Sequence, residues 1–461
     1  MVATACLATF VSLDAAVVNM AVGPIAADLS ASTATVAWTV SAYSITFAAG
    51  WAAAGQLADA VDHRVVLWAG IAVFAGASGV CAASPDLAVL VGARAAQGAG
   101  AAMLLPAALA ALPAASAPTR SAAMTGAWSA TGAAALGPVV GAALVDVWGW
   151  WAIFVVNLPL CLVLAAVSAV LPPGRRRLRG LPDVSGAVGL SMGVGAVAVA
   201  LAEGGDWDPL VRLLVVSVGV AATAAVVARS GLHPRPALPV RLWRKRRFAM
   251  ASVVSFGLGA GFVCYLLAAP LLLTSVWGVP LLVAAACVGS TGVEAMLAAA
   301  VVSRVITQSS ARWWCAGGML SVAAGFAVLS SPAVGAERAW PAWGMVVALL
   351  GLGMGAAVTA VSVICADVPD AREYVAAVGL NLTTGQLGGA IGIATAAAVV
   401  SPERFLGGFH AVFALVAVLS VGAAVAAAGF LRPPASATSP TPISAAAGKE
   451  CARWPVIRST K

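Results

Sequence analysis

Charged residues are scarce in this chain, because Asp, Glu, Lys and Arg together make up only 9% of its 461 residues. In soluble globular domains the charged share is about a quarter. Apolar residues instead make up 62% of the chain, and its mean hydropathy is +1.00. This shortage of charge excludes a soluble globular protein and predicts one that is embedded in a lipid bilayer.

The residues from which metal and catalytic sites are built are few and dispersed. The three histidines, His63, His233 and His410, lie in loops or at the edges of apolar segments. The eight cysteines lack the spacing of metal ligands, and seven of them lie in apolar runs, where a thiol packs as a small hydrophobic group. The sequence also lacks a nucleophile paired with a base and a nucleotide-binding domain. We therefore expect no metal, no cofactor, no enzyme and no ATP-driven pump.

The net charge of +8 does not indicate a nucleic-acid partner. The basic residues cluster at Arg175–Arg179 and Arg241–Arg247, each in a short link between apolar runs. Membrane proteins with several spans carry such clusters in their cytoplasmic loops. We therefore expect the lipid bilayer, and no nucleic acid, as the surroundings of this chain.

Apolar segments fill almost the whole sequence. Each is long enough to cross the hydrocarbon core as a helix, which takes about 20 residues. The segments cover residues 3–24, 36–57, 65–83, 87–111, 121–143, 151–171, 184–202, 209–228, 248–273, 281–303, 313–331, 342–365, 374–399 and 407–430. They predict an all-α polytopic membrane protein with 14 transmembrane helices. No basic residue precedes the first segment, so we interpret it as a span rather than a cleaved signal peptide.

The positions of Lys and Arg predict the orientation. An even number of spans places both termini on one side. If that side is cytoplasmic, the external loops hold only Arg212, Arg338 and Arg404, while the internal loops hold both basic clusters. The positive-inside rule therefore predicts a multi-pass protein of the cell membrane with cytoplasmic termini.

Charged links divide the chain into four parts. We expect a six-helix bundle over residues 1–171, two linker helices with basic cytoplasmic loops over 172–247, and a second six-helix bundle over 248–431. Residues 432–461 are rich in Pro, Ser, Thr and Ala and predict a disordered cytoplasmic tail. Two six-helix bundles around a central cavity are typical of alternating-access transporters.

Two ionisable residues, Asp14 and Arg94, lie inside apolar segments. An ionisable side chain at membrane depth costs at least ~2.5–3.5 kcal/mol, so it normally lines a pathway or finds a partner. On a helix, Arg94, Gln97 and Gly98 share one face, which points a cation and an amide into the protein. Two interpretations are open: a role in proton coupling, or an arginine that only ties helices together.

Glu294 is the other acid deep in an apolar run, and Ser290 and Thr291 share its helical face. This carboxylate is a candidate second proton carrier or a binding group for cationic compounds. A structural partner role is the alternative.

Two further patterns concern helix packing and gating. Gly137 and Gly141 fall on one face of a helix, and Pro138 between them removes a backbone hydrogen bond, so we expect a bent, closely packed helix. Asp59 and Arg64 lie near a helix end, where a carboxylate can hold a neighbouring helix N-terminus by its dipole. The alternative is a solvated loop. The candidate gating residues are Gly55, Asp59, Arg64, Gly137, Pro138 and Gly141.

Together these segments resemble the major facilitator superfamily, and more narrowly its fourteen-helix drug:proton antiporter branch. Leu13–Asn19 is similar to the first-helix signature of that branch, Leu90–Ala102 to its arginine-containing fourth-helix motif, and Gly137–Gly141 to its fifth-helix antiporter motif. The stretches Trp148–Trp150 and Phe154–Pro159 follow at familiar places. The resemblance covers nearly the whole chain.

The chain departs from the family pattern at several positions. Ala60 stands where a basic residue is usual, and Asp62 where a glycine is usual. Ala133 and Ala142 replace glycines of the fifth-helix motif, and the corresponding loop of the second half, Ser303–Thr307, lacks the acid. These departures indicate a weakened or rebuilt cytoplasmic gate.

The resemblance implies a proton-coupled exporter of small hydrophobic or amphipathic drugs or antibiotics, in which Asp14 and Arg94 take part in proton coupling. Its partners would be a small-molecule substrate and protons, and we expect a monomer. Export of one endogenous natural product, and facilitated uptake of a small solute on the same fold, are the alternatives. The candidate residues of the substrate cavity are Asn19, Gln97, Thr359, Asn381 and Gln386.

Overall fold

The computed structural model describes residues 2–110, 120–169, 183–202, 207–233, 236, 238–366, 371–399 and 405–430. All regular secondary structure in these residues is helical. This is the expected outcome for apolar segments in lipid, where a helix satisfies every backbone polar group within one segment. The predicted tail over 432–461 and the Arg175–Arg179 cluster lie outside the described residues.

The first part of the chain forms the helices that carry Asp14 and Arg94. They are α1 (Val2–Val17), η1 (Val18–Ala21), α2 (Val22–Asp28), α3 (Thr33–Val36), α4 (Trp38–Ala60), α5 (His63–Ala82), α6 (Leu87–Ala110), α7 (Arg120–Trp148), α8 (Ala152–Val155) and α9 (Asn157–Ala169).

A helical hairpin and a second group of helices follow. The hairpin is α10 (Val184–Ala202) and α11 (Pro209–Leu232), followed by the short η2 (Val240–Arg244). The second group is α12 (Arg246–Leu271), η3 (Leu272–Val276), α13 (Leu281–Val305), α14 (Ala311–Leu329), α15 (Trp340–Cys365), α16 (Ala371–Val399) and α17 (Phe405–Phe430).

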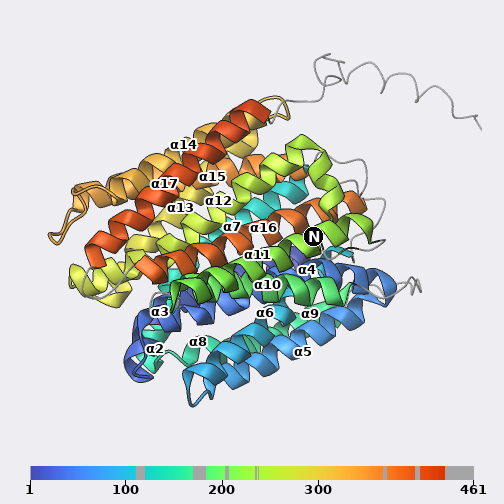
Figure 1. The fold of residues 1–461 in the computed structure, drawn as a ribbon, viewed down its shortest axis with the longest axis horizontal. Helices are drawn as coiled ribbons and strands as arrows, with labels where there is room; N and C mark the ends of the chain where they lie inside the picture. The colour runs from blue at the N-terminus through green and yellow to red at the C-terminus, as the bar shows by residue number, and fades with distance from the viewer. Residues whose placement is uncertain are drawn as a thin grey trace, which may run out of the picture.

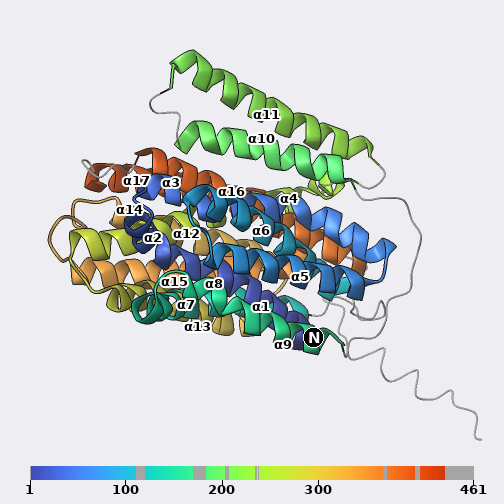
Figure 2. The same ribbon diagram turned by 90° about the horizontal axis from the view of Figure 1, so that it is seen from below.

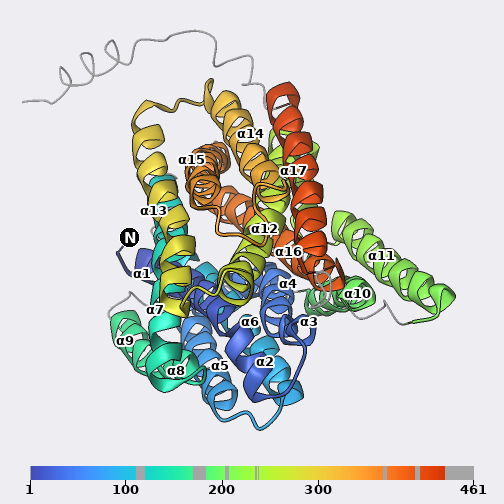
Figure 3. The ribbon, with the colours of Figure 1, turned by 90° about the vertical axis from the view of Figure 1, so that its left-hand side faces the viewer.

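The long helices run in roughly one direction and form two groups, as Figures 1 and 3 show. The first group contains α1 to α9 and the second contains α12 to α17. The α10–α11 hairpin stands to one side of both groups (Figure 2) and packs through α10 against α4 and α16. The two groups meet along two seams, α7 against α13 and α4 against α16.

Eleven helical segments of the described chain are long and apolar enough to cross a membrane. The chain is therefore a multi-pass membrane protein. The three other predicted spans fold as α4, α7 and α16, so each predicted segment is helical, but the count of fourteen crossings stays a prediction. These three helices all lie in the seams between the two groups.

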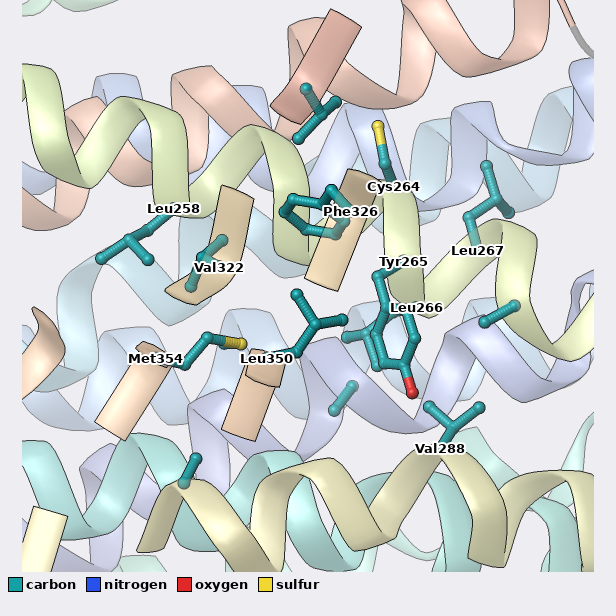
Figure 4. Close-up of a cluster of buried hydrophobic side chains, with 14 of the residues drawn as sticks. Leu258, Cys264, Tyr265, Leu266, Leu267, Val288, Val322, Phe326, Leu350 and Met354 are labelled. Atoms are coloured by element: carbon teal, nitrogen blue, oxygen red, sulfur yellow. The ribbon is translucent and has the colours of Figure 1, made fainter. Parts of the chain in front are cut away.

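Aromatic and aliphatic side chains fill the core of the second group. Tyr265, Phe326 and Leu350 are buried there, as Figure 4 shows. The Phe326 ring stacks on that of Phe413 at a centroid distance of 5.5 Å. The same apolar cluster continues into Val18 of η1. The two helix groups therefore share apolar packing around η1.

Two helices of the first group are interrupted close to prolines. The first predicted span changes from α-helix to 3-10 helix at Val18–Ala21, just before Pro24. The sixth breaks between α8 and α9, just before Pro159. Proline lacks the N–H that would bond to the carbonyl four residues earlier, and its ring crowds that carbonyl. Both interruptions fall next to the buried polar groups described below.

Candidate functional site

Asp14 and Arg94, predicted from their membrane depth, form an ion pair between α1 and α6. Arg94 Nη1 lies 3.0 Å from Asp14 Oδ2, and the two side chains are 0% and 2% exposed, respectively. Removing a carboxylate and a guanidinium from water costs several kcal/mol each, so the pair is stable only with good geometry and further hydrogen bonds.

Amide side chains supply those further bonds. Gln97 Nε2 donates to Asp14 Oδ1 at 3.3 Å and to Ser78 Oγ at 2.8 Å, while Gln97 Oε1 accepts from Arg94 Nη1 at 2.6 Å. Asn157 Nδ2 donates to Asp14 Oδ1 at 2.6 Å. Five side chains from α1, α5, α6 and α9 thus form one buried network, which we call the Asp14 network.

The Arg94 guanidinium is also held by α4. Its Nε donates to the Thr39 carbonyl at 2.9 Å, and its central carbon lies 4.3 Å from the centroid of the Tyr43 ring. The Phe154 ring lies 5.9 Å away. Contacts of a guanidinium with aromatic faces are attractive, and more so when water is excluded. The Nη2 atom has no hydrogen-bond partner among the described residues.

Small residues allow α4 and α6 to approach each other closely. A Cβ atom at Gly98 would clash with the Tyr43 carbonyl and the Thr46 hydroxyl. The Thr46 Oγ1 donates to the Ala95 carbonyl at 2.8 Å, which joins the two helices directly. The predicted shared face of Arg94 and Gly98 is therefore confirmed.

The predicted packing face of α7 lies against α1, beside Asp14. A Cβ atom at Gly137 would come within 2.5 Å of Ala16 Cβ, and one at Gly141 within 2.7 Å of the Val17 carbonyl oxygen. The close packing predicted for these glycines is confirmed. Pro138 lies inside α7, which continues through it as one helix.

The predicted gating residues do not form one cluster. Gly55 packs ordinarily on α6, since its Cβ position lies 3.6 Å from Pro106 Cβ. Arg64 Nη2 donates to the Ala169 carbonyl at 3.0 Å, which ties α5 to the end of α9 within the first group. The side chain of Asp59 lies outside the described part of the structure.

Glu294 lies on α13 in the second helix group, apart from the Asp14 network. Its side chain is partly exposed, and it makes no hydrogen bond or ion pair with the described residues. It sits where α13 and α15 approach closely, because a Cβ at Gly351 would come within 2.5 Å of Glu294 Cβ.

The candidate cavity residues are dispersed. Asn19 is buried in η1, where its Nδ2 donates to the Ala15 carbonyl at 3.0 Å. Thr359 Oγ1 donates to the Gly355 carbonyl of its own helix at 2.7 Å. Asn381 accepts a bond from Ser255, and Gln386 is partly buried on α16. Only Gln97 lies in the Asp14 network.

Sequence reasoning missed two members of this network, Ser78 and Asn157. Asn157 is an uncharged amide in a run of apolar residues, directly before Leu158 and Pro159. A polar residue next to a helix-breaking proline is a usable signal, but its partner depends on how α9 packs against α1. Within the described residues, no group of three or more His, Cys, Asp or Glu side chains is placed to hold a metal ion.

Comparison with known proteins gives concordant results. The family model of the Major Facilitator Superfamily matches residues 4–393. The chain is 34% identical to the methylenomycin A resistance protein of Bacillus subtilis (strain 168) over 256 residues, which is 53% of this chain and 54% of that protein. It is 32% identical over 406 residues to the puromycin resistance protein pur8 of Streptomyces alboniger, covering 83% of this chain and 78% of that protein.

The alignments with the methylenomycin A resistance proteins of Bacillus subtilis and Streptomyces coelicolor span about half the length of those relatives. Among solved structures, the chain is similar in fold to the human organic anion transporter MFSD10 (TETRAN), with a TM-score of 0.63 at 15% sequence identity. That match covers 92% of this chain and 98% of the human chain.

Proposed function

The chain belongs to the Major Facilitator Superfamily, and on this premise we propose that it is a proton-coupled antiporter that exports small hydrophobic or amphipathic antibiotics. The buried Asp14–Arg94 ion pair is the observation that carries the proposal. The names of the relatives support the substrate class, since they are resistance proteins for methylenomycin A, puromycin and, in Streptomyces glaucescens, tetracenomycin C.

The chemistry of the pair explains how a proton would drive transport. Arginine does not lose its proton in proteins, so only protonation of Asp14 can uncouple the pair. A neutral Asp14 leaves the buried guanidinium without its counter-ion, which destabilises the arrangement seen here. The helices around the pair then favour a second conformation in which Arg94 is hydrated or paired otherwise. A proton that enters along a membrane potential of ~100 mV contributes about 2.3 kcal/mol to this cycle.

The packing supports an alternating-access cycle. Met20 of η1, Ala142 of α7 and Ala285 of α13 form a buried cluster across the two helix groups. With both termini in the cytoplasm, as the Lys and Arg bias predicts, this cluster lies on the external side. In the proposed cycle the two bundles rock about their seams and so open and close this contact.

The other assignments are part of the same proposal. We assign fourteen crossings in a cell membrane, arranged as two six-helix bundles and a linker hairpin, and a monomeric state. Gly137, Pro138 and Gly141 would let α1 slide on α7 during the cycle, with Gly55, Asp59 and Arg64 at the cytoplasmic gate. Asn19, Thr359, Asn381 and Gln386 would line the cavity, and Glu294 would bind a cationic substrate or a second proton.

Efflux measurements in cells test the proposal. Cells that express the protein should accumulate less puromycin, methylenomycin A or tetracenomycin C than cells without it, and an uncoupler should abolish the difference. Asp14→Asn should abolish export while the protein remains in the membrane. The matched control is Asp146→Asn, which makes the same chemical change at an exposed position of α7.

Three outcomes separate the alternatives. Export of one compound alone, out of a broad panel, would indicate a dedicated natural-product exporter. Uptake or efflux at a rate that the uncoupler does not change would indicate a facilitator. Export by Asp14→Asn at the rate of the unchanged protein would refute the role of Asp14.

A further inference from the structure

Asn157 donates a short hydrogen bond to Asp14 from a helix that contributes no other donor to this carboxylate. Its Nδ2 donates the shortest hydrogen bond that the carboxylate receives, at 2.6 Å, and the residue is 4% exposed. The other two donors, Arg94 and Gln97, come from one helix, α6, and are bonded to each other. Asn157 is the contribution of a different helix, α9.

The backbone of the sixth predicted span places this amide. Helix α8 ends at Val155 and α9 begins at Asn157, so the amide lies at the interruption that precedes Pro159. A continuous helix would give this position a different direction relative to α1. The proline therefore contributes to the Asp14 network indirectly, by fixing where α9 begins.

The three donors differ in what they can do when Asp14 is protonated. Arg94 only donates hydrogen bonds and cannot accept one from a carboxylic acid. Gln97 is held at both ends, since its oxygen accepts from Arg94 and its nitrogen donates to Ser78. The Asn157 side chain makes no hydrogen bond with the described residues other than the one to Asp14. Turning its amide over would present an acceptor oxygen to the acid O–H.

From this geometry the structure assigns Asn157 as a positioning residue that sets the proton affinity of Asp14, donating to the carboxylate and accepting from the carboxylic acid. The assignment rests on the proposed function, because it concerns the proton-carrying step of that cycle. It adds a third helix to the coupling site, so movement of α9 relative to α1 becomes linked to the charge on Asp14.

The ionisable groups around Asp14 come from four neighbouring helices. They are Arg94 of α6, Tyr43 of α4, Cys81 of α5 and Cys161 of α9. Helix α7 also packs against α1. Among its described side chains the ionisable one is Asp146, which is exposed near the C-terminal end of the helix. Substitution of Asn157 leaves all of these groups in place.

The pH profile of efflux in proteoliposomes tests the assignment. Export requires release of the proton from Asp14 to the inside, so efflux by the unchanged protein should rise with internal pH. Asn157→Ala removes a donor from the carboxylate and makes the anion less favourable. The internal pH of half-maximal efflux should therefore rise by about one unit, the shift that corresponds to one hydrogen bond to a charged group.

Asn157→Asp is the second variant, because it keeps the size of the side chain and so protects the packing. It places a second carboxylate beside Asp14, and two carboxylates in one site hold a shared proton strongly. The midpoint should rise further than in Asn157→Ala. Ser168→Ala is the control on the same helix, since Ser168 is buried and, among the described residues, its hydroxyl bonds only to the Ala165 carbonyl of α9.

The outcomes separate the two proposals. A lower maximal rate with an unmoved midpoint in both Asn157 variants would overturn the assignment and leave a merely structural residue. A shift in the Asn157 variants but not in Ser168→Ala supports it. Efflux by the unchanged protein that is flat across pH would instead refute proton coupling itself.

Discussion

The two helix bundles bury polar groups of different kinds. The first bundle buries a carboxylate, a guanidinium and two amides in one network around Asp14. The buried polar residues of the second bundle, within the described chain, are serines and threonines, and several bond to carbonyls of their own helices, as Thr359 and Ser420 do. Hydroxyls stay neutral across the physiological range, so these buried side chains of the second bundle carry no charge. Among the described residues of the two bundles, the buried ion pair therefore lies in the first bundle, and the buried polar side chains of the second are neutral.

Among the substitutions considered, loss of Arg94 should have the largest effect on export and stability. Arg94→Leu leaves the Asp14 carboxylate buried without its counter-ion, and breaking a buried pair in this way costs about 3–5 kcal/mol. We expect loss of export and a lower Tm in detergent. Arg94→Lys keeps the charge and should retain the fold, although it loses the bond to Thr39 and the contact with Tyr43. Equal stability of Arg94→Leu and the unchanged protein would contradict the claim that the pair is a buried ion pair.

A core substitution in the second bundle should destabilise the protein without touching the proton chemistry. Phe326 is 1% exposed and stacks on Phe413. Phe326→Ala should therefore lower the free energy of unfolding by about 3–5 kcal/mol. The midpoint of the pH profile of efflux should not move. Thermal unfolding and the pH profile, measured on the same preparation, check both parts. A shifted midpoint would show that the second bundle also sets the proton affinity.

Glu294 should give the smallest and most selective effect. Its partly exposed carboxylate has no hydrogen-bond or ion-pair partner in the described chain, so Glu294→Gln should change the stability by less than about 0.5 kcal/mol. If the carboxylate binds cationic substrates, export of cations should fall while export of neutral compounds persists. Parallel efflux assays with one cationic and one neutral compound measure this. Equal retention of both would contradict a role of Glu294 in binding cationic substrates.

The sequence was sufficient to predict the all-helical fold and to single out the two residues of the central ion pair. The cost of charge in a membrane singles out Asp14 and Arg94, and the spacing of Gly137 and Gly141 indicates a packing face. These features depend on local periodicity and on a large desolvation penalty.

The remainder of the site depends on tertiary packing. Asn157 carries no charge, and its bond to Asp14 exists because α9 begins after a proline and lies near α1. The gating residues illustrate the same limit, since the bond from Arg64 to Ala169 joins residues that no sequence motif connects.

Proton movement coupled to substrate tests the central claim most directly. Inside-out vesicles with an acidified interior report their pH gradient through a fluorescent dye, and a substrate that is pumped inward in exchange for protons dissipates that gradient. The account predicts dissipation on addition of an exported antibiotic for the unchanged protein and for Asp146→Asn, and none for Asp14→Asn. Full dissipation by Asp14→Asn would contradict it.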